Sequence, residues 1–346
     1  MALIQYWRVL PRPLRIIAGR LVMIVPQMFG VMLVTFLLVR LLPGDPALLM
    51  LGNMATEEQI IALREKLGLN LSVYEQFIQY ADNVLHGDLG VSPFTSNPVV
   101  VDLLERAPAT LELITYAMLL TILIGVTLAV ISVVRPRGPI DYGSRVYGLA
   151  AGAIPDFWVG LLLIYFFFYV LGWAPAPFGR VDAMVTPPPM VTGFYTIDSL
   201  LTGDFAAFFS AVGRLLLPVL TLAIVNAGAL MKMTKTVFAD AYRSEFIRHQ
   251  RACGLSERTI VRSALRNSLP PIITLVGFLF GFLLGAAVLV ETIFSWGGLG
   301  QYAVQAVINS DYPALQGFVL VAAAFILVVY LVVDILYELA DPRIKV

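Results

Sequence analysis

The sequence predicts an all-α protein that crosses a membrane six times, and composition, apolar runs and loop charge each support this prediction. Apolar residues make up 59% and charged residues 13% of the chain, with a mean hydropathy of +0.85, whereas soluble domains carry about 25% charged residues. Several apolar runs exceed ~18 residues, which is enough helix to cross a bilayer. Cys253 is the only cysteine, and His86 and His249 are the only histidines. These counts exclude an intrachain disulfide and a metal site built from several cysteines or histidines.

The predicted spans are joined by loops of alternating charge. They cover residues 21–42, 110–134, 146–172, 215–231, 271–294 and 314–339. Lysine and arginine gather in the N-terminal arm 1–20, the loop 135–145, the loop 232–270 and the C-terminal tail, and the other loops are poor in them. The positive-inside rule therefore places both termini in the cytoplasm. A signal peptide is the alternative for the N-terminus, but its apolar run is longer than a usual signal core of roughly 7–15 residues.

Residues 43–109 are predicted to form a small helical cap on the outer face. The sequence Pro43-Gly44-Asp45-Pro46 ends the first span. Three helix starts are predicted by capping-box pairs and by an Asn-Pro pair: Thr56 with Gln59, Ser72 with Glu75, and Asn97 with Pro98, the third helix running to about Arg106. The Pro-rich loop 173–213 is expected to complete this outer face.

The stretch 242–271 is a basic segment between two apolar runs, with six arginines and two glutamates. It is predicted to contain one helix from Ala239 to Cys253, a turn at Gly254, and a second helix that starts at Ser256. Pro270-Pro271 is expected to reset the chain before the fifth span. No G-x-x-x-x-G-K-[ST] loop is present to hold ATP, so a rigid helix pair here would transmit movement from a soluble partner. The alternative is a basic loop that fixes topology and contacts anionic lipid headgroups.

The order of residues in this stretch resembles a known family. The matching segments are Glu245-Phe246-Ile247-Arg248, Arg251-Ala252-Cys253-Gly254-Leu255-Ser256 and Ala264-Leu265-Arg266-Asn267-Ser268. They resemble the cytoplasmic loop of the permeases of binding-protein-dependent ABC importers, and the peptide/nickel branch in particular. Further similar motifs are Leu42-Pro43-Gly44-Asp45-Pro46, His86-Gly87-Asp88-Leu89-Gly90, Ala109-Thr110-Leu111-Glu112-Leu113, the segment Glu291 to Gly300, Asp311-Tyr312-Pro313 and Asp341-Pro342-Arg343.

The resemblance implies that the loop forms a coupling helix, which docks into a cleft on an ATPase subunit. The residues that it assigns to this contact are Glu245, Arg248, Arg251, Ala252, Gly254, Leu255 and Ser256. Two positions depart from the general importer pattern and agree with the peptide branch. Arg248 stands where most importers have an acidic residue, and Arg266-Asn267 stands where many have Leu-Pro.

The function implied by the resemblance is that of one permease subunit of an ATP-driven importer in a bacterial inner membrane. Its cargo would be di- or oligopeptides delivered by a solute-binding protein, or else a nickel chelate, glutathione or an oligosaccharide. Its partners would be a homologous second permease, two ATPase subunits and membrane lipid, but no nucleic acid. ATP and magnesium would be held by the ATPase subunits, and this chain would carry no cofactor and no catalytic residue. An ion-coupled secondary transporter, an intramembrane enzyme and a membrane scaffold remain as alternative classes.

Two smaller groups of residues are candidate sites within the transport unit. Asp156 follows Pro155 about ten residues into the third span, or ~15 Å deep. It could face the pathway together with Trp158 and Asn226, or it could cap a locally broken helix. Trp296, Gly298, Gly300 and Tyr302 are expected to contact the binding protein. The remaining span charges, Arg40, Glu112, Glu291, Asp334 and Glu338, lie near predicted span ends, where snorkelling or helix capping accounts for them.

Overall fold

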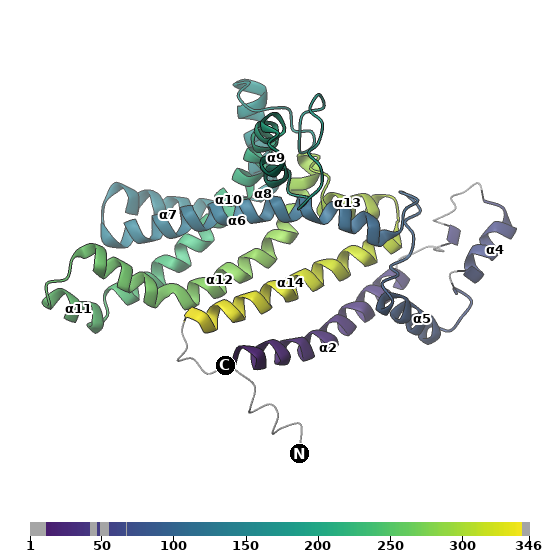
Figure 1. Cartoon of the computed structure of the whole chain (residues 1–346), viewed down its shortest axis with the longest axis horizontal. Coiled ribbons are helices and arrows are strands. Elements are labelled where there is room, and N and C mark those ends of the chain that lie inside the picture. Colours follow the sequence, from purple (N-terminus) through teal and green to yellow (C-terminus); the bar gives the residue numbers. More distant parts are fainter. Residues whose placement is uncertain (1–11, 42–46, 49–54, 67, 341–346) are drawn as a thin grey trace, which may run out of the picture.

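Residues 12–41, 47–48, 55–66 and 68–340 are described by the computed structural model, and they are helical without a β-sheet. Five helices are long and apolar enough to cross a membrane: α2 (Arg12–Leu41), α6 (Val99–Val134), α10 (Phe205–Tyr242), α12 (Glu257–Ile293) and α14 (Tyr312–Ala340). They lie side by side in the order α6, α10, α12, α14, α2 (Figure 1). The prediction of a polytopic all-α membrane protein is therefore confirmed.

The third predicted span, 146–172, is not one straight helix. The structure divides it into α7 (Pro139–Ala151), α8 (Asp156–Leu163) and a π-helix (Ile164–Val170), with a bend of 109° between the first two. Proline lacks an amide hydrogen and disfavours helical geometry in the residue before it, so Pro155 ends the continuity of the span. Counting this bent pair as one span gives six in the described chain.

Two other predicted interruptions are absent. The third cap helix and the second span form one helix, α6, which passes through Pro108, and α12 passes through Pro270 and Pro271. Long membrane helices tolerate proline because neighbouring helices and side chains satisfy the freed backbone groups. Conversely, the helix predicted from Ala239 to Cys253 is split, because α10 ends at Tyr242 and α11 (Glu245–Ala252) starts a new helix.

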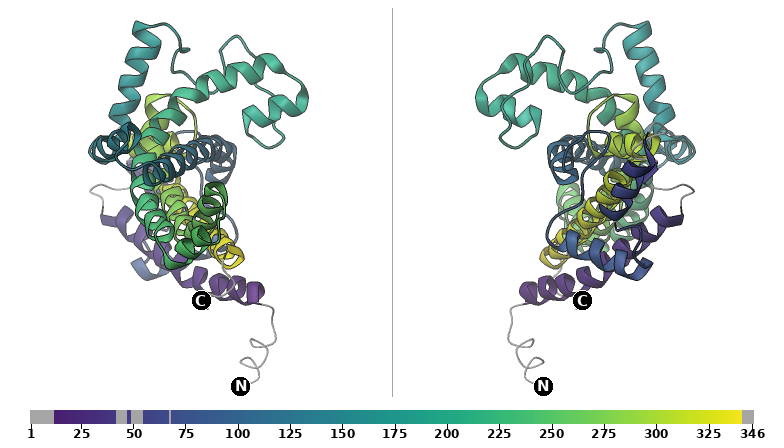
Figure 2. Two further views of the ribbon diagram at one scale, coloured as in Figure 1. Left: turned by 90° about the vertical axis from the view of Figure 1, so that its left-hand side faces the viewer. Right: turned by 90° about the vertical axis from the view of Figure 1, so that its right-hand side faces the viewer.

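The two ends of the helix layer carry different structures. At one end lies α11, and at the opposite end lie α4 (Glu57–Lys66), α5 (Val73–Leu85) and α13 (Leu299–Ile308) (Figure 1). The α5 helix starts with the predicted capping box between Ser72 and Glu75. Thr56 and Gln59 form the other predicted box, with backbone-to-side-chain distances of 3.0 and 3.3 Å. The start of α2 and the end of α14 lie toward the α11 end in Figure 1, and Figure 2 shows the molecule from each of the two ends.

The main core is formed where α6, α10 and α12 pack together. Its fully buried side chains include Leu113, Leu222 and Leu283, one from each helix. The helix α7 of the bent span approaches α10 closely at Gly228. A Cβ added there would lie 2.3 Å from the Cβ of Ala151. Small residues allow such close helix packing in membranes. The core therefore ties the bent span to the central helix of the layer.

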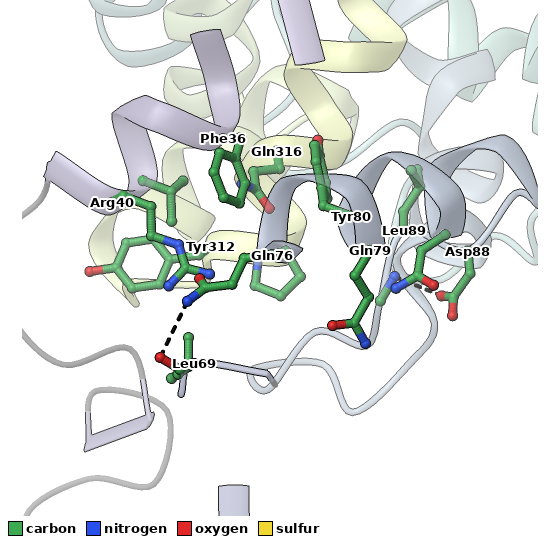
Figure 3. Close-up of a pocket in the computed structure, with 14 residues that line it drawn as sticks. Phe36, Arg40, Leu69, Gln76, Gln79, Tyr80, Asp88, Leu89, Tyr312 and Gln316 are labelled. Carbon is green, nitrogen blue, oxygen red and sulfur yellow. Dashed lines mark hydrogen bonds between the residues drawn. The ribbon is translucent and has the colours of Figure 1, made fainter. Parts of the chain in front are cut away.

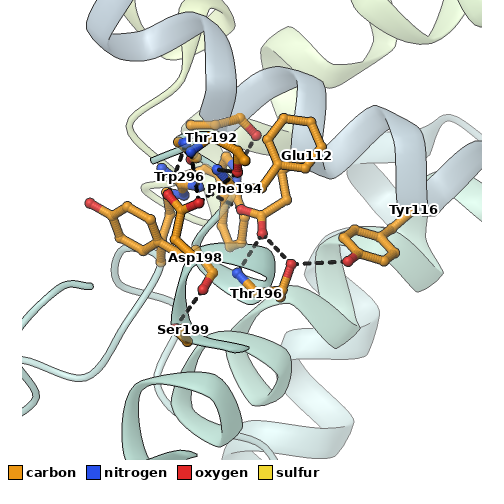
Figure 4. A network of polar contacts seen from close by, with 12 residues as sticks. Glu112, Tyr116, Thr192, Phe194, Thr196, Asp198, Ser199 and Trp296 are labelled. Atoms are coloured by element: carbon orange, nitrogen blue, oxygen red, sulfur yellow. Dashed lines mark hydrogen bonds and ion pairs between the residues drawn. The ribbon is translucent and has the colours of Figure 1, made fainter. Parts of the chain in front are cut away.

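A buried ion pair holds the segment 173–213 against α6. Glu112 and Arg180 are joined by an Oε2–Nη2 distance of 2.5 Å, and their side chains are only 2% and 10% exposed. The other oxygen of Glu112 accepts from the amide and hydroxyl of Thr196, at the start of α9 (Tyr195–Thr202), at 2.9 and 2.7 Å (Figure 4). Arg180 also donates to the carbonyl of Gly193 at 2.7 Å and lies 3.6 Å from the ring centroid of Tyr195. This network fixes the projecting segment relative to the spans.

The first prediction concerns this ion pair. Replacing Arg180 by Met leaves the Glu112 carboxylate buried without its cation, which should cost about 3–5 kcal/mol of stability. We expect a lower unfolding temperature of the protein in lipid nanodiscs and faster proteolysis within 173–213. The double variant Arg180→Met/Glu112→Gln should recover part of the loss, because it removes the buried charge.

The control for this prediction is Arg145→Met, which removes an arginine whose side chain is 64% exposed in its ion pair with Asp141. Asp141 is buried but keeps its contacts with Lys235 at 2.6 Å and Ser132 at 2.9 Å, so losing the exposed Arg145 leaves no unpaired charge and should change stability little. Equal effects of the Arg180 and Arg145 substitutions, with no recovery in the double variant, would show that the buried pair does not hold the segment.

Candidate functional site

The short helix α11 is the main candidate site, because it projects from the end of the layer and presents exposed side chains. Ser244 caps its start by accepting from the amide of Ile247, and Cys253 caps its end. Gly254 then adopts a left-handed conformation with φ +77°, which favours glycine. The seven residues assigned to ATPase contact are all exposed: Glu245, Arg248, Arg251, Ala252, Gly254, Leu255 and Ser256.

One apolar side chain fixes α11 to the spans. Ile247 is completely buried, and it packs with Phe238 of α10 and with Ile260 and Ala264 of α12. Partly buried valines at the end of α6, Val130, Val133 and Val134, complete this cluster. The side of α11 that faces the protein is therefore joined to three spans, while its opposite side stays open to a partner.

Polar contacts reinforce the same connection. Arg251 lies 3.4 Å from a carboxylate oxygen of Glu257 at the start of α12 and 4.5 Å from the ring centroid of Tyr242 at the end of α10. Gln250 donates to the hydroxyl of Ser263 at 3.3 Å. Arg248 forms an ion pair with Glu245 within α11 itself. The arginine at the unusual position therefore has an acidic neighbour on the same exposed helix.

A second polar cluster at this end was missed by the sequence reasoning. The buried carboxylate of Asp141 in α7 accepts from Lys235 of α10 at 2.6 Å, Ser132 of α6 at 2.9 Å and Arg145 at 3.0 Å. The sequence signal was a single acidic residue in a loop of arginines, but nothing in the sequence identified Lys235 as its partner. This cluster connects the bent span to α10, seven residues before α10 ends.

The candidate pathway residues lie together only in part. Asp156 is the first residue of α8, at the break formed by residues 152–155, and it is half-buried. One of its carboxylate oxygens accepts from the side-chain amide of buried Asn226 at 3.2 Å. Trp158 is 46% exposed on α8, and no hydrogen bond joins it to this pair. The structure therefore brings Asp156 and Asn226 together and leaves Trp158 on an open surface.

The four expected binding-protein contacts are not at the surface. Trp296, Gly298, Gly300 and Tyr302 are all buried. The indole nitrogen of Trp296 donates to the carbonyl of Ala109 at 2.9 Å, and a Cβ added at Gly298 would lie 2.4 Å from the hydroxyl of Thr110. These residues pack the start of α13 against α6 and α12, and their burial leaves them no exposed surface for a binding protein in this conformation.

Tyr302 shows how fully this region is enclosed. Burial and the nearby carboxylates of Asp102 and Asp311 raise the pKa of the Tyr302 hydroxyl well above its ordinary value. The hydroxyl stays protonated and donates to Asp102 at 3.2 Å. Asp102 also accepts from Thr95 at 2.5 Å, so the site is a structural network between α6 and α13.

Two glutamates that were interpreted as span-end residues are instead central to the outer end. Glu112 holds the segment 173–213, as described above. Glu291 is completely buried and accepts from Thr110 at 2.5 Å and from the amide of Gln301 at 3.1 Å. Glu112 follows Thr110 on α6, and Glu291 contacts the hydroxyl of Thr110 from α12. The sequence does not show that distant loops fold back onto these two glutamates.

Comparison with known proteins agrees with this arrangement. Residues 121–346 match the family described as binding-protein-dependent transport system inner membrane component, and residues 13–114 match the N-terminal model of such membrane components. The chain is 40% identical over 334 residues to the di/tripeptide transport system permease protein of Pseudomonas aeruginosa, covering 96% of this chain and 99% of that protein.

Two further relatives are similar. The probable D,D-dipeptide transport system permease protein of Escherichia coli is 41% identical over 316 residues, covering 91% of this chain and 93% of that protein. The dipeptide transport system permease protein of Alkalihalophilus pseudofirmus is 37% identical over 327 residues, covering 94% of this chain and 98% of that protein. These matches confirm the resemblance predicted from the stretch 242–271. The chain is a multi-pass membrane protein that belongs to the inner-membrane permease components of binding-protein-dependent transport systems.

Proposed function

We propose that this chain is the permease subunit that carries di- or oligopeptides through the membrane in an ATP-driven importer. The observation that carries the proposal is α11, which is exposed on one side and joined by Ile247 to three spans on the other. The names of the relatives support peptides as cargo. Nickel chelates, glutathione and oligosaccharides remain the alternatives within the same machinery.

The proposed partners follow from what the chain presents at each end. Two ATPase subunits with bound ATP and magnesium would dock at α11 and at its counterpart on a homologous second permease. A solute-binding protein would dock at the opposite end, on the cap helices and the segment 173–213. Both termini would then lie in the cytoplasm, on the α11 side of the layer, as loop charge also predicts.

The geometry supports a mechanical route from α11 to the pathway. Only Arg243 and Ser244 separate α10 from α11, and only residues 253–256 separate α11 from α12. A movement of α11 is therefore passed to both spans rather than absorbed by flexible linkers. Lys235 and Asp141 pass the movement of α10 to α7, and α7 leads through the break at 152–155 to Asp156. Closure of the ATPase pair would thus alternate the access of the pathway.

The second prediction tests the turn after α11. Proline fixes φ near −65° and cannot adopt the +77° of Gly254, whereas asparagine tolerates the left-handed region. A Cβ at this position meets no atom within 4 Å, so Gly254→Asn is a control without a clash. We expect Gly254→Pro to lower peptide uptake at least about tenfold and to abolish stimulation of ATP hydrolysis by the binding protein, as measured in proteoliposomes.

Assembly must be intact for this comparison, so the amount of ATPase that co-purifies with each variant is measured first. Normal uptake by Gly254→Pro in assembled complexes would refute transmission through α11. If uptake of every tested peptide also fails in the wild-type complex, peptide cargo is wrong while coupling can still be read from ATP hydrolysis.

The third prediction concerns the charge of Asp156. Asp156→Asn keeps an oxygen that can accept from Asn226 and removes only the negative charge. We expect uptake of peptides with a free ammonium or a cationic side chain to fall roughly tenfold through a higher KM, with a smaller effect on acidic peptides. Asn226→Ala is the companion variant, because it leaves the charge and removes the donor that orients it. Unchanged uptake of all peptides by Asp156→Asn would exclude Asp156 from the pathway.

A further inference from the structure

A cavity with a mixed polar and apolar lining lies far from α11 and from Asp156, where the outer end of α2 meets α5 and the start of α14. It is lined by residues of all three elements and of the segment after α5, and its volume is about 210 Å³ (Figure 3). The polar side chains that the argument uses are Arg40, Gln76 and Asp88. Neither the coupling helix nor the proposed pathway accounts for this cavity.

Gln76 gives the cavity an acceptor without a partner. The residue is 8% exposed, and its amide nitrogen donates to the carbonyls of Leu69 at 3.2 Å and Leu71 at 2.8 Å. Its side-chain oxygen is buried and makes no hydrogen bond with the described part of the chain. Buried acceptors are almost always paired in proteins, because an unpaired one loses its interaction with water. The oxygen therefore requires a donor from outside the described chain.

Arg40 places a cation in the same cavity. Its guanidinium lies 5.2 Å from the ring centroid of Phe36, and no described carboxylate lies within ion-pair distance of it. In Figure 3, the side chains of Arg40 and Gln76 extend into the same part of the cavity. Within the described residues, the Arg40 guanidinium has no carboxylate partner and the Gln76 oxygen has no donor. This combination fits a ligand that carries an anion and a hydrogen-bond donor next to each other.

The position of the cavity indicates where such a ligand comes from. Arg40 is the last residue of the candidate span Gly19–Arg40, so the cavity lies at the level of a membrane surface. The span is only 17% buried, and Leu37 and Leu33 are exposed about one and two turns before Arg40. Acyl chains can cover these side chains while a headgroup enters the cavity. The first span is also at the edge of the helix layer, where lipid has access (Figure 1).

We propose that this cavity binds the headgroup of a zwitterionic phospholipid that carries a primary ammonium. The phosphate pairs with the guanidinium of Arg40, and the ammonium donates to the side-chain oxygen of Gln76. The carboxylate of Asp88, at the other end of the cavity in Figure 3, adds a negative potential that favours the ammonium. Bound lipid thereby joins the first span to α5 of the cap. The proposal requires that α2 spans the membrane, and it does not depend on the transported solute.

The experiment uses the whole permease complex, purified in detergent and freed of lipid. Thermal unfolding is followed while dihexanoyl phosphatidylethanolamine is added below its micelle concentration. Dihexanoyl phosphatidylcholine is the matched probe, because it has the same phosphate and chains but no N–H donor. Inorganic phosphate and a dipeptide test the two soluble sources of the same chemistry. The variants are Arg40→Gln and, as a control at the other membrane surface, Arg135→Gln, whose arginine is exposed.

We expect the ethanolamine lipid to stabilise the wild-type complex. Its dissociation constant should be at least about tenfold lower than that of the choline lipid. Arg40→Gln should lower the affinity for the ethanolamine lipid at least about tenfold, and Arg135→Gln should leave this affinity unchanged. Native mass spectrometry should show the ethanolamine lipid retained by the wild-type permease and lost in Arg40→Gln. The same spectra show whether the Arg40→Gln complex is still assembled, and this separates loss of lipid from unfolding. Equal binding of both lipids, equal binding by Arg40→Gln, or a stronger response to phosphate or dipeptide would each overturn the proposal.

Discussion

The burial of Ile247 is the interaction on which the proposed action of this protein depends. It is the completely buried side chain of α11, and it contacts Phe238 of α10 and Ile260 of α12. An apolar contact of this kind gains free energy from the area removed from water, and it is lost if α11 swings away from the spans. The helix must therefore move together with its spans. The exposed arginines and glycine turn on the other side of α11 are free to meet a partner because this one side chain holds the helix.

The other end of the layer is held by buried charged groups in addition to apolar packing between α6, α13 and α14. Glu112 pairs with Arg180, and Glu291 binds Thr110 and a backbone amide. Such groups are costly to bury, and each requires a partner in a defined position. They fix the segments at this end to α6. Hydrogen bonds and ion pairs are directional, so they resist sliding more than an apolar contact does. The result is a rigid outer end, so relative movement within the subunit is concentrated elsewhere.

The sequence predicted the fold class and most of the membrane helices well, because these depend on local signals. Apolar runs specify membrane helices, and Ser72 with Glu75 specifies a helix start through neighbours three residues apart. Contacts between distant segments could not be predicted in the same way. Trp296 and Tyr302 carry the features of interface residues, yet their surroundings are supplied by α6, nearly 200 positions earlier in the chain. Proline effects were misjudged for a related reason, since Pro270 and Pro271 lie within the packed helix α12, whereas the predicted third span breaks at Pro155.

The break at residues 152–155 lies between the end of the layer that is held rigid and the α11 end, which a partner ATPase would move. On one side of it, α7 is joined to α10 by the Asp141–Lys235 pair and by the close contact at Gly228. On the other side, α8 begins with Asp156 and turns away by 109°. A straight helix would transmit any displacement of its inner end along its full length. A bent span without backbone hydrogen bonds across the bend can change its angle at low cost, because few interactions must be broken. The side chain placed at that bend is the carboxylate of Asp156, which accepts from Asn226 at 3.2 Å, so a change of angle would alter the position of this group.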